Sequence, residues 1–293
     1  MQRVRKLLHI DAAEKRKLTG AGIGVGVLDS GVLLHDDFTE RVALFRNFTL
    51  EGGQKIQDET GHGTHVCGII AGSGRISGGK YRGIAPGSHL CVGKILNHKG
   101  EGDVSMMIHG LEWLLSEADK QNIKVINISV SSLYFSKENE KVFRLFEQAY
   151  RRNILIVTAA GNSGPGGSTV SKLGDSPYVI CVGCHEGKES VLFDKKCQDC
   201  SGRGPGTFVY RKPDVVAPGT DIISCSGVSR YVKKSGTSMA TPIVAGLLAL
   251  GYEKEPDASA EEMKRRLIRT TDDLGENFLL QGFGMVNAER FLR

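Results

Sequence analysis

Several features that mark other protein classes are missing from this sequence of 293 residues. It has no apolar run near the roughly 18 residues that cross a bilayer, so we expect no membrane span. Its 38 glycines follow no Gly-X-Y period, which excludes collagen. Hydrophobic residues make up 40% and charged residues 24%, and this balance excludes disorder as the main state. Domain-sized linkers and internal repeats are also lacking.

Basic residues interleaved with aromatic ones are absent too. Lys and Arg outnumber Asp and Glu by 38 to 33, but the clusters near the N-terminus and at 264–266 are typical of solvated helix faces. We therefore expect no nucleic-acid partner. The basic N-terminus lacks the apolar core of a secretory signal, because His9 and Asp11 interrupt it. The expected location is the cytoplasm, without a membrane partner.

The number of cysteines, seven, is odd, so they cannot all pair within the chain, and reduced thiols are expected in the cytoplasm. Cys181 and Cys184, followed by Cys197 and Cys200, have the spacing of a zinc knuckle. An odd offset along a strand sends side chains to opposite faces, so Cys181 and Cys184 are not expected to share one ligand set. A zinc site on Cys184, Cys197 and Cys200 stays open, with free thiols as the alternative.

Strand-like and helix-like segments alternate along most of the chain. This alternation predicts an α/β fold with a doubly wound, mostly parallel sheet. The capping box Ser259-x-x-Glu262 predicts the start of the last amphipathic helix. We expect residues 1–18 to form a charged, helical N-terminal extension and 19–293 to form the main domain. The predicted strands are 23–28, 90–96, 125–130, 154–158, 178–182 and 221–225, and the predicted helices include 62–71, 104–120 and 142–149.

Three reactive side chains occur where a strand ends or a helix begins. Asp29 closes a buried strand, His62 opens a helix between two glycines, and Ser238 starts a long apolar helix. A serine hydroxyl needs an adjacent base, and a histidine needs a carboxylate to fix its tautomer. The pattern therefore predicts nucleophilic acyl transfer. Asn162, in a glycine-flanked turn, and the N–H groups at the start of the Ser238 helix would hold the oxyanion.

Each residue also has a structural interpretation. Asp29 would serve as a turn residue and Ser238 as a helix cap. His62 and His65 would be a metal pair, but a zinc site needs three or four ligands and no further partner is recognisable. The glycines at 20–26 lack the G-x-G-x-x-G spacing, so no dinucleotide cofactor is expected.

Taken together, the motifs around Asp29, His62, Asn162 and Ser238 resemble those of the subtilisin-like serine proteases, most of all the short intracellular bacterial members. The resemblance covers roughly residues 19–293. It implies a three-layer α/β/α fold and a serine endopeptidase that works through an acyl-enzyme. Asp29, His62 and Ser238 would be the triad, Asn162 the oxyanion donor, and no cofactor would enter the chemistry.

The resemblance also implies a groove for an extended polypeptide substrate. The segment 99–102 resembles the family's edge strand, which pairs with the substrate backbone. Ser131 stands where the family usually has glycine, which would narrow the pocket for the residue before the scissile bond. The implied substrate-binding residues are Gly100, Gly102, Ser129, Ser131, Ala160 and Gly161.

Two further departures bear on metals and thiols. Cys67 replaces the usual alanine one turn below His62, which predicts sensitivity to mercury or oxidation. Asp37 matches a family calcium position, so a structural calcium stays open, although one carboxylate is not a site. Two rival interpretations remain: a catalytically silent peptide-binding or regulatory scaffold, and a zinc-dependent module on the cysteine pairs.

Overall fold

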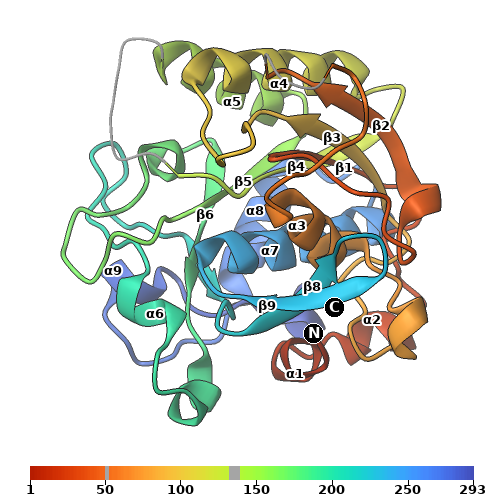
Figure 1. The fold of residues 1–293 in the computed structure, drawn as a ribbon. Coiled ribbons are helices and arrows are strands. Elements are labelled where there is room, and N and C mark those ends of the chain that lie inside the picture. Colours follow the sequence, from red (N-terminus) through yellow and green to blue (C-terminus); the bar gives the residue numbers. More distant parts are fainter. Residues whose placement is uncertain (50–52, 132–138) are drawn as a thin grey trace.

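A seven-stranded parallel sheet runs through the centre of the protein (Figure 1). The structure is a computed structural model that describes residues 1–49, 53–131 and 139–293. The strand order β2-β3-β1-β4-β5-β6-β7 is that of a doubly wound sheet, as predicted. The strands are β1 (Gly24–Asp29), β2 (Val42–Asn47), β3 (His89–Lys94), β4 (Ile123–Ile128), β5 (Leu155–Ala159), β6 (Val179–Cys184) and β7 (Val215–Ala217).

Helices cover both faces of this sheet and make the three layers that were expected (Figure 1). On one face lie α4 (Val104–Glu117) and α5 (Asn139–Arg151). On the other lie α3 (His62–Ala71) and α7 (Thr237–Lys254), with the antiparallel hairpin of β8 (Ile222–Ser226) and β9 (Arg230–Lys234) beside α3. The remaining helices are α1 (Gln2–Leu7), α2 (Asp11–Lys15), α6 (Cys197–Cys200), α8 (Ala260–Arg269), α9 (Phe278–Gln281) and α10 (Ala288–Phe291).

Strand β1 shows why the sheet is buried on both faces. Val25 and Val27 belong to the core beneath α3 and α7, whereas Leu28 belongs to the core beneath α4. This alternation follows the two-residue period of a strand. Buried on both sides, the strand delivers Asp29 to the carboxyl edge of the sheet, where open α/β sheets place their ligands.

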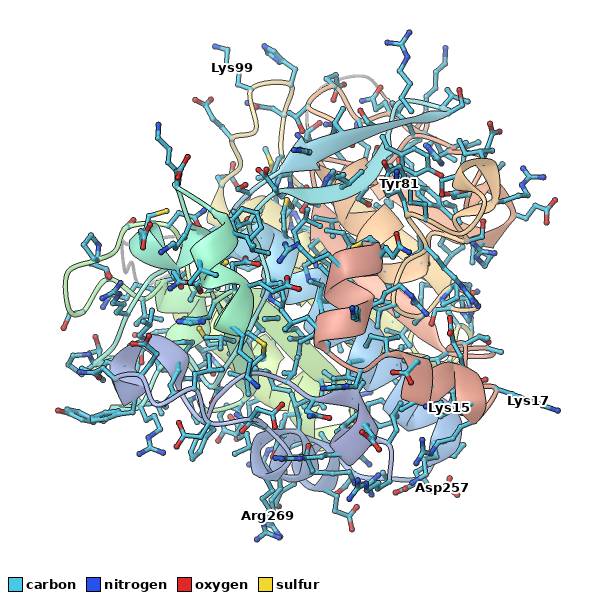
Figure 2. All side chains as sticks on the ribbon, turned by 90° about the horizontal axis from the view of Figure 1, so that it is seen from below. Lys15, Lys17, Tyr81, Lys99, Asp257 and Arg269 are labelled. Carbon is cyan, nitrogen blue, oxygen red and sulfur yellow. The ribbon has the colours of Figure 1, made fainter. Side chains whose placement is uncertain are left out.

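The N-terminal segment is helical, as predicted, and shares the main core through the buried Val4 and Leu8. Arg3 fixes it to the body of the protein, with 2.5 Å between its Nη1 and Oε2 of the buried Glu186. Lys15 is exposed, as a solvated helix face predicts (Figure 2). The same prediction is wrong for Arg3 and Arg5, since Arg3 pairs with Glu186 and the Arg5 side chain is only 12% exposed. The segment therefore packs as part of one body with the sheet.

Two details at the C-terminal end differ from the predictions. The capping box of Ser259 and Glu262 starts α8 as predicted, but α9 and α10 follow it, so α8 is not the last helix. Lys264 is not a solvated side chain, because its ammonium donates to the carbonyl oxygens of Pro177 and Val179. Within the described residues, no helix is both long and apolar enough to span a bilayer.

Candidate active site

Asp29 and His62 meet at the carboxyl edge of the sheet. His62 Nδ1 lies 2.7 Å from Asp29 Oδ1, and the Asp29 side chain is fully buried while that of His62 is 27% exposed. Because the carboxylate can only accept, Nδ1 carries the proton and donates it. This tautomer leaves Nε2 of His62 as a free base on the solvent side.

The start of helix α3 is held in place by a residue that the sequence reasoning missed. The buried carboxylate of Asp58 accepts hydrogen bonds from the Gly61 N–H at 3.0 Å and the Thr64 N–H at 2.8 Å. It thereby satisfies two N–H groups of the helix start and complements the helix dipole. Its position four residues before His62, just ahead of a helix start, is the signal that would have found it.

Two glycines bring α3 close to the loop that follows β1. Gly61 has a φ of 65°, a left-handed conformation that a residue with a Cβ avoids. At Gly63 a Cβ would lie 2.0 Å from the carbonyl oxygen of Gly31, so only glycine permits this approach. The Gly-His-Gly motif therefore sets His62 against Asp29.

The surroundings of His62 shift its proton affinity. Burial lowers its pKa, but the charge of Asp29 and the hydrogen bond to it raise the pKa by more, so the net value lies above the ordinary 6.5. Lys234 opposes this rise and Asp58 supports it. A base with a pKa raised above its usual range is suited to accept a hydroxyl proton near neutral pH.

Ser238 lies in the first turn of α7, as predicted. Its hydroxyl donates to the carbonyl oxygen of Ser129 at 2.8 Å. Within the described part of the chain, no hydrogen bond joins it to His62, a common state of a site without substrate. Attack would require the hydroxyl to turn from Ser129 to His62 Nε2.

Asn162 is oriented by the same helix start. Its Oδ1 accepts from the Thr237 N–H at 3.0 Å and from the Thr237 hydroxyl at 3.2 Å. The side chain is exposed, and its amide Nδ2 donates to no acceptor among the described residues, so both of its hydrogens are available. The arrangement gives one side-chain donor beside the N-terminus of α7, as an oxyanion hole requires.

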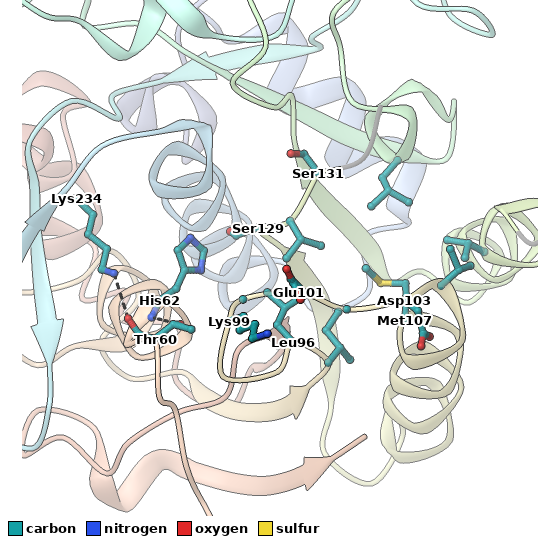
Figure 3. A pocket seen from close by; sticks show the side chains of 17 residues that line it. Thr60, His62, Leu96, Lys99, Glu101, Asp103, Met107, Ser129, Ser131 and Lys234 are labelled. Carbon is teal, nitrogen blue, oxygen red and sulfur yellow. Dashed lines mark hydrogen bonds between the residues drawn. The ribbon is translucent and has the colours of Figure 1, made fainter. Parts of the chain in front are cut away.

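A groove of about 730 Å³ opens beside His62 (Figure 3). Gly100, Gly102, Ser129 and Ser131 all line it, in agreement with the expectation. Gly161 lies across from Ser131, since a Cβ on it would be 3.5 Å from the Ser131 Cβ. The Ser131 side chain thus occupies the space beside Gly161.

Two expected features of the groove were wrong. Ala160 does not present its side chain to the groove, because it is buried in a small cluster with Val170 and Cys181. The segment 99–102 is not an edge strand. It forms a turn because the Asn97 side-chain oxygen accepts from the N–H groups of Lys99 and Glu101.

The cysteines are all unpaired thiols, and six of the seven are buried. Cys181 lies apart from Cys184, with Ala160 and Val170, as the strand offset predicted. Cys184 and Cys197 flank Gly219, and Cys200 is exposed. Zinc on these cysteines stays an untested prediction. Burial, above all, raises the pKa of Cys67 well above its ordinary value, so its thiol stays protonated.

The residues at Asp37 do not fit a calcium ion. Among the described residues, the metal-binding side chains that gather within 4.8 Å are His35, Asp37 and Cys225. The Asp37 carboxylate accepts from the Tyr231 hydroxyl at 2.7 Å, and the ring nitrogens of His35 contact the Asp37 N–H and the Arg230 carbonyl. Calcium needs six to eight oxygen ligands, whereas this set holds sulfur and nitrogen and is already hydrogen-bonded.

Comparison with known proteins agrees with this geometry. Residues 20–286 match the profile of the subtilase family. The serine protease AprX of Bacillus subtilis (strain 168) is 36% identical over 93% of this chain, which spans 66% of the length of AprX. The intracellular serine protease of Paenibacillus polymyxa is 33% identical, over 91% of this chain and 79% of that protein.

The fold is likewise similar to a solved structure, that of sphericase. The two share a TM-score of 0.80 and 28% identity, over 92% of each chain. The order of the sheet, the site at its carboxyl edge and the sequence match all point the same way. The chain belongs to the subtilase family, whose enzymes are serine endopeptidases.

Proposed function

We propose that this protein hydrolyses peptide bonds with Asp29, His62 and Ser238 as its catalytic triad. Ser238 Oγ attacks the scissile carbonyl carbon while His62 Nε2 takes the hydroxyl proton. Asn162 Nδ2 and the Ser238 N–H stabilise the oxyanion. His62 then returns the proton to the departing amine, which leaves Ser238 acylated. A water, deprotonated by His62, hydrolyses this ester and restores the hydroxyl.

The observation that carries the proposal is the 2.7 Å contact between His62 Nδ1 and a fully buried Asp29. A buried carboxylate holding one tautomer of a half-buried histidine has little structural purpose at a sheet edge. It does stabilise the imidazolium that forms when Ser238 gives up its proton. The silent-scaffold interpretation has no comparable support.

The substrate is proposed to be a polypeptide bound in an extended conformation. The groove beside His62 is lined by Ser129 and Ser131 and by apolar side chains that include Met107 and Leu173. Such a groove takes successive side chains of one segment in separate pockets. Ser131 favours a small residue before the scissile bond, because its side chain stands where the pocket would open.

We also propose that the protein acts in the cytoplasm. One relative at 33% identity is named an intracellular serine protease. The seven cysteines are all unpaired, which suits a reducing compartment.

The test is the digestion of an unfolded protein such as casein by wild type, Ser238→Ala and the matched control Ser235→Ala. Ser235 is a hydroxyl three residues earlier that accepts from the Asp221 N–H, outside the proposed machinery. Wild type and Ser235→Ala should cleave, and Ser238→Ala should lose at least about 10³-fold in rate. Cleavage by Ser238→Ala at the wild-type rate would refute Ser238 as the nucleophile. If wild type neither cleaves casein nor reacts with a fluorophosphonate, the silent-scaffold interpretation is favoured.

A further inference from the structure

We infer that Lys234 makes the leaving-group side of the active site selective for a carboxylate, carried by the substrate just after the bond that is cut. The inference rests on the proposed function. Lys234 is the last residue of β9 and precedes Ser238 by four positions. Its side chain lines the same groove as His62, although the sequence motifs gave no reason to single it out.

The position of Lys234 assigns it to one half of the substrate. Figure 3 shows Lys234 on one side of His62, with Ser129 and Ser131 on the opposite side. The Lys234 ammonium is 3.5 Å from the carbonyl oxygen of Thr60, two residues before His62. The acyl half of the substrate occupies the side of Ser129 and Ser131. The departing amine therefore leaves past His62 toward Lys234.

Among the residues that the structure describes, no carboxylate pairs with the charge of Lys234. In the described ranges 1–49, 53–131 and 139–293, no carboxylate lies within 4.0 Å of its ammonium. Asp58 is occupied by the N–H groups of α3, and Asp29 by His62. The acidic residues of the groove, Glu101 and Asp103, lie on the acyl side of His62 (Figure 3).

The neighbouring Lys233 shows the contrast. Successive side chains of a strand point to opposite sides, and the Lys233 ammonium turns away from the groove to lie 3.2 Å from the Asp221 carboxylate. Lys234 instead presents to the departing chain a partly buried cation that pairs with no carboxylate of the described residues. Such a cation attracts a carboxylate and repels a basic side chain.

Two groups could supply this carboxylate: an Asp or Glu side chain after the cut, or the C-terminal carboxylate of a short peptide. An ion pair between side chains that are exposed or half-buried changes binding affinity about two- to fivefold. We therefore expect kcat/KM to be about two- to fivefold higher for a peptide with Glu directly after the cut than for the same peptide with Gln there. The second source is tested with free and amidated C-termini two residues after the cut.

The experiment measures these ratios with internally quenched peptides, with the cut mapped by mass spectrometry. It compares wild type with Lys234→Gln, Lys234→Glu, Lys234→Arg and the matched control Lys233→Gln. Fluorophosphonate labelling of each variant verifies that the site is formed. Wild type, Lys234→Arg and Lys233→Gln should favour Glu over Gln about two- to fivefold. Lys234→Gln should show a ratio near one, and Lys234→Glu should favour Gln.

Two results would overturn the inference: a ratio near one in wild type for both carboxylate sources, or an equal loss of preference in Lys233→Gln and Lys234→Gln. The latter would assign the preference to the general field of the hairpin. These failures are distinct from failure of the proposed function. Wild type that cuts Glu and Gln peptides alike is still a protease, whereas wild type that neither cuts nor takes the label refutes both.

Discussion

Replacing Asp58 with asparagine should both destabilise the protein and change the pH dependence of its catalysis. The Asp58 carboxylate holds two backbone N–H groups at the start of α3, one on each oxygen: Gly61, just before the helix, on Oδ1 and Thr64, in its first turn, on Oδ2. Asparagine keeps one accepting oxygen. Whichever way its amide lies, one backbone N–H of the helix start loses its acceptor and faces an NH2 donor instead.

The magnitude follows from these contacts. A buried N–H left without a partner costs about 1–3 kcal/mol, and loss of a negative charge at a helix start costs about 0.3–1 kcal/mol more. Asp58→Asn should therefore lower the free energy of unfolding by about 1–4 kcal/mol. Urea unfolding followed by fluorescence measures this loss. The control Asp257→Asn, an exposed site at the edge of the molecule (Figure 2), should change it by less than about 0.5 kcal/mol.

The same substitution should move the acid limb of kcat/KM to lower pH. The negative charge of Asp58 helps to raise the pKa of His62, and catalysis needs His62 in its neutral form. Removing the charge lowers this pKa, so activity should persist to lower pH than in wild type. An unchanged unfolding midpoint, or an acid limb that moves to higher pH, would contradict the role given to Asp58.

Three other predictions concern the groove and the thiols. Asn162→Ala should lower kcat by about 10²–10³-fold with little change in KM, a magnitude known from subtilisin itself; a loss confined to KM would contradict its role as oxyanion donor. Ser131→Gly should raise kcat/KM by about tenfold for peptides with an aromatic residue before the cut, relative to the same peptides with alanine. A fall in the ratio of kcat/KM for aromatic over alanine peptides would show that Ser131 does not block large side chains from the pocket. An aromatic disulfide reagent should modify one thiol of the folded protein, Cys200, and none in Cys200→Ala; rapid modification of Cys67 would contradict its burial.

The sequence predicted those parts of the site that are set by element boundaries. Asp29 ends a strand and His62 and Ser238 open helices, and all three positions were visible in the order of apolar and small residues. The carboxyl ends of parallel strands meet at one edge of a sheet, so elements far apart in the chain bring their ends together. The local pattern of apolar and small residues, together with the fold class, was sufficient to place these three residues at one site.

Contacts between distant segments could not be predicted in this way. The unpaired charge of Lys234 depends on which carboxylates of other elements stay out of its reach. Lys264 lies on a helix face that looked solvated, yet its ammonium reaches the carbonyl oxygens of Pro177 and Val179, at the start of β6, more than 80 residues away in the chain. Charge and periodicity describe one element at a time and carry no information on such neighbours.

The turn at 99–102 was mispredicted for a different reason. The family resemblance suggested a strand. Instead, the side-chain oxygen of Asn97 accepts hydrogen bonds from the N–H groups of Lys99 and Glu101, two and four residues later, and this produces a turn. Such a turn is a local preference of asparagine. The sequence contained the signal, and the resemblance outweighed it.

The proposed role of Ser238 is that of a nucleophile activated by His62 and Asp29. Its most direct test is labelling of the folded protein with a fluorophosphonate, followed by peptide mapping in a mass spectrometer. We predict a single adduct on Ser238, lost in Ser238→Ala and slowed at least about 10³-fold in His62→Ala. An adduct on another residue, or labelling of Ser238 at the same rate without His62, would contradict the account.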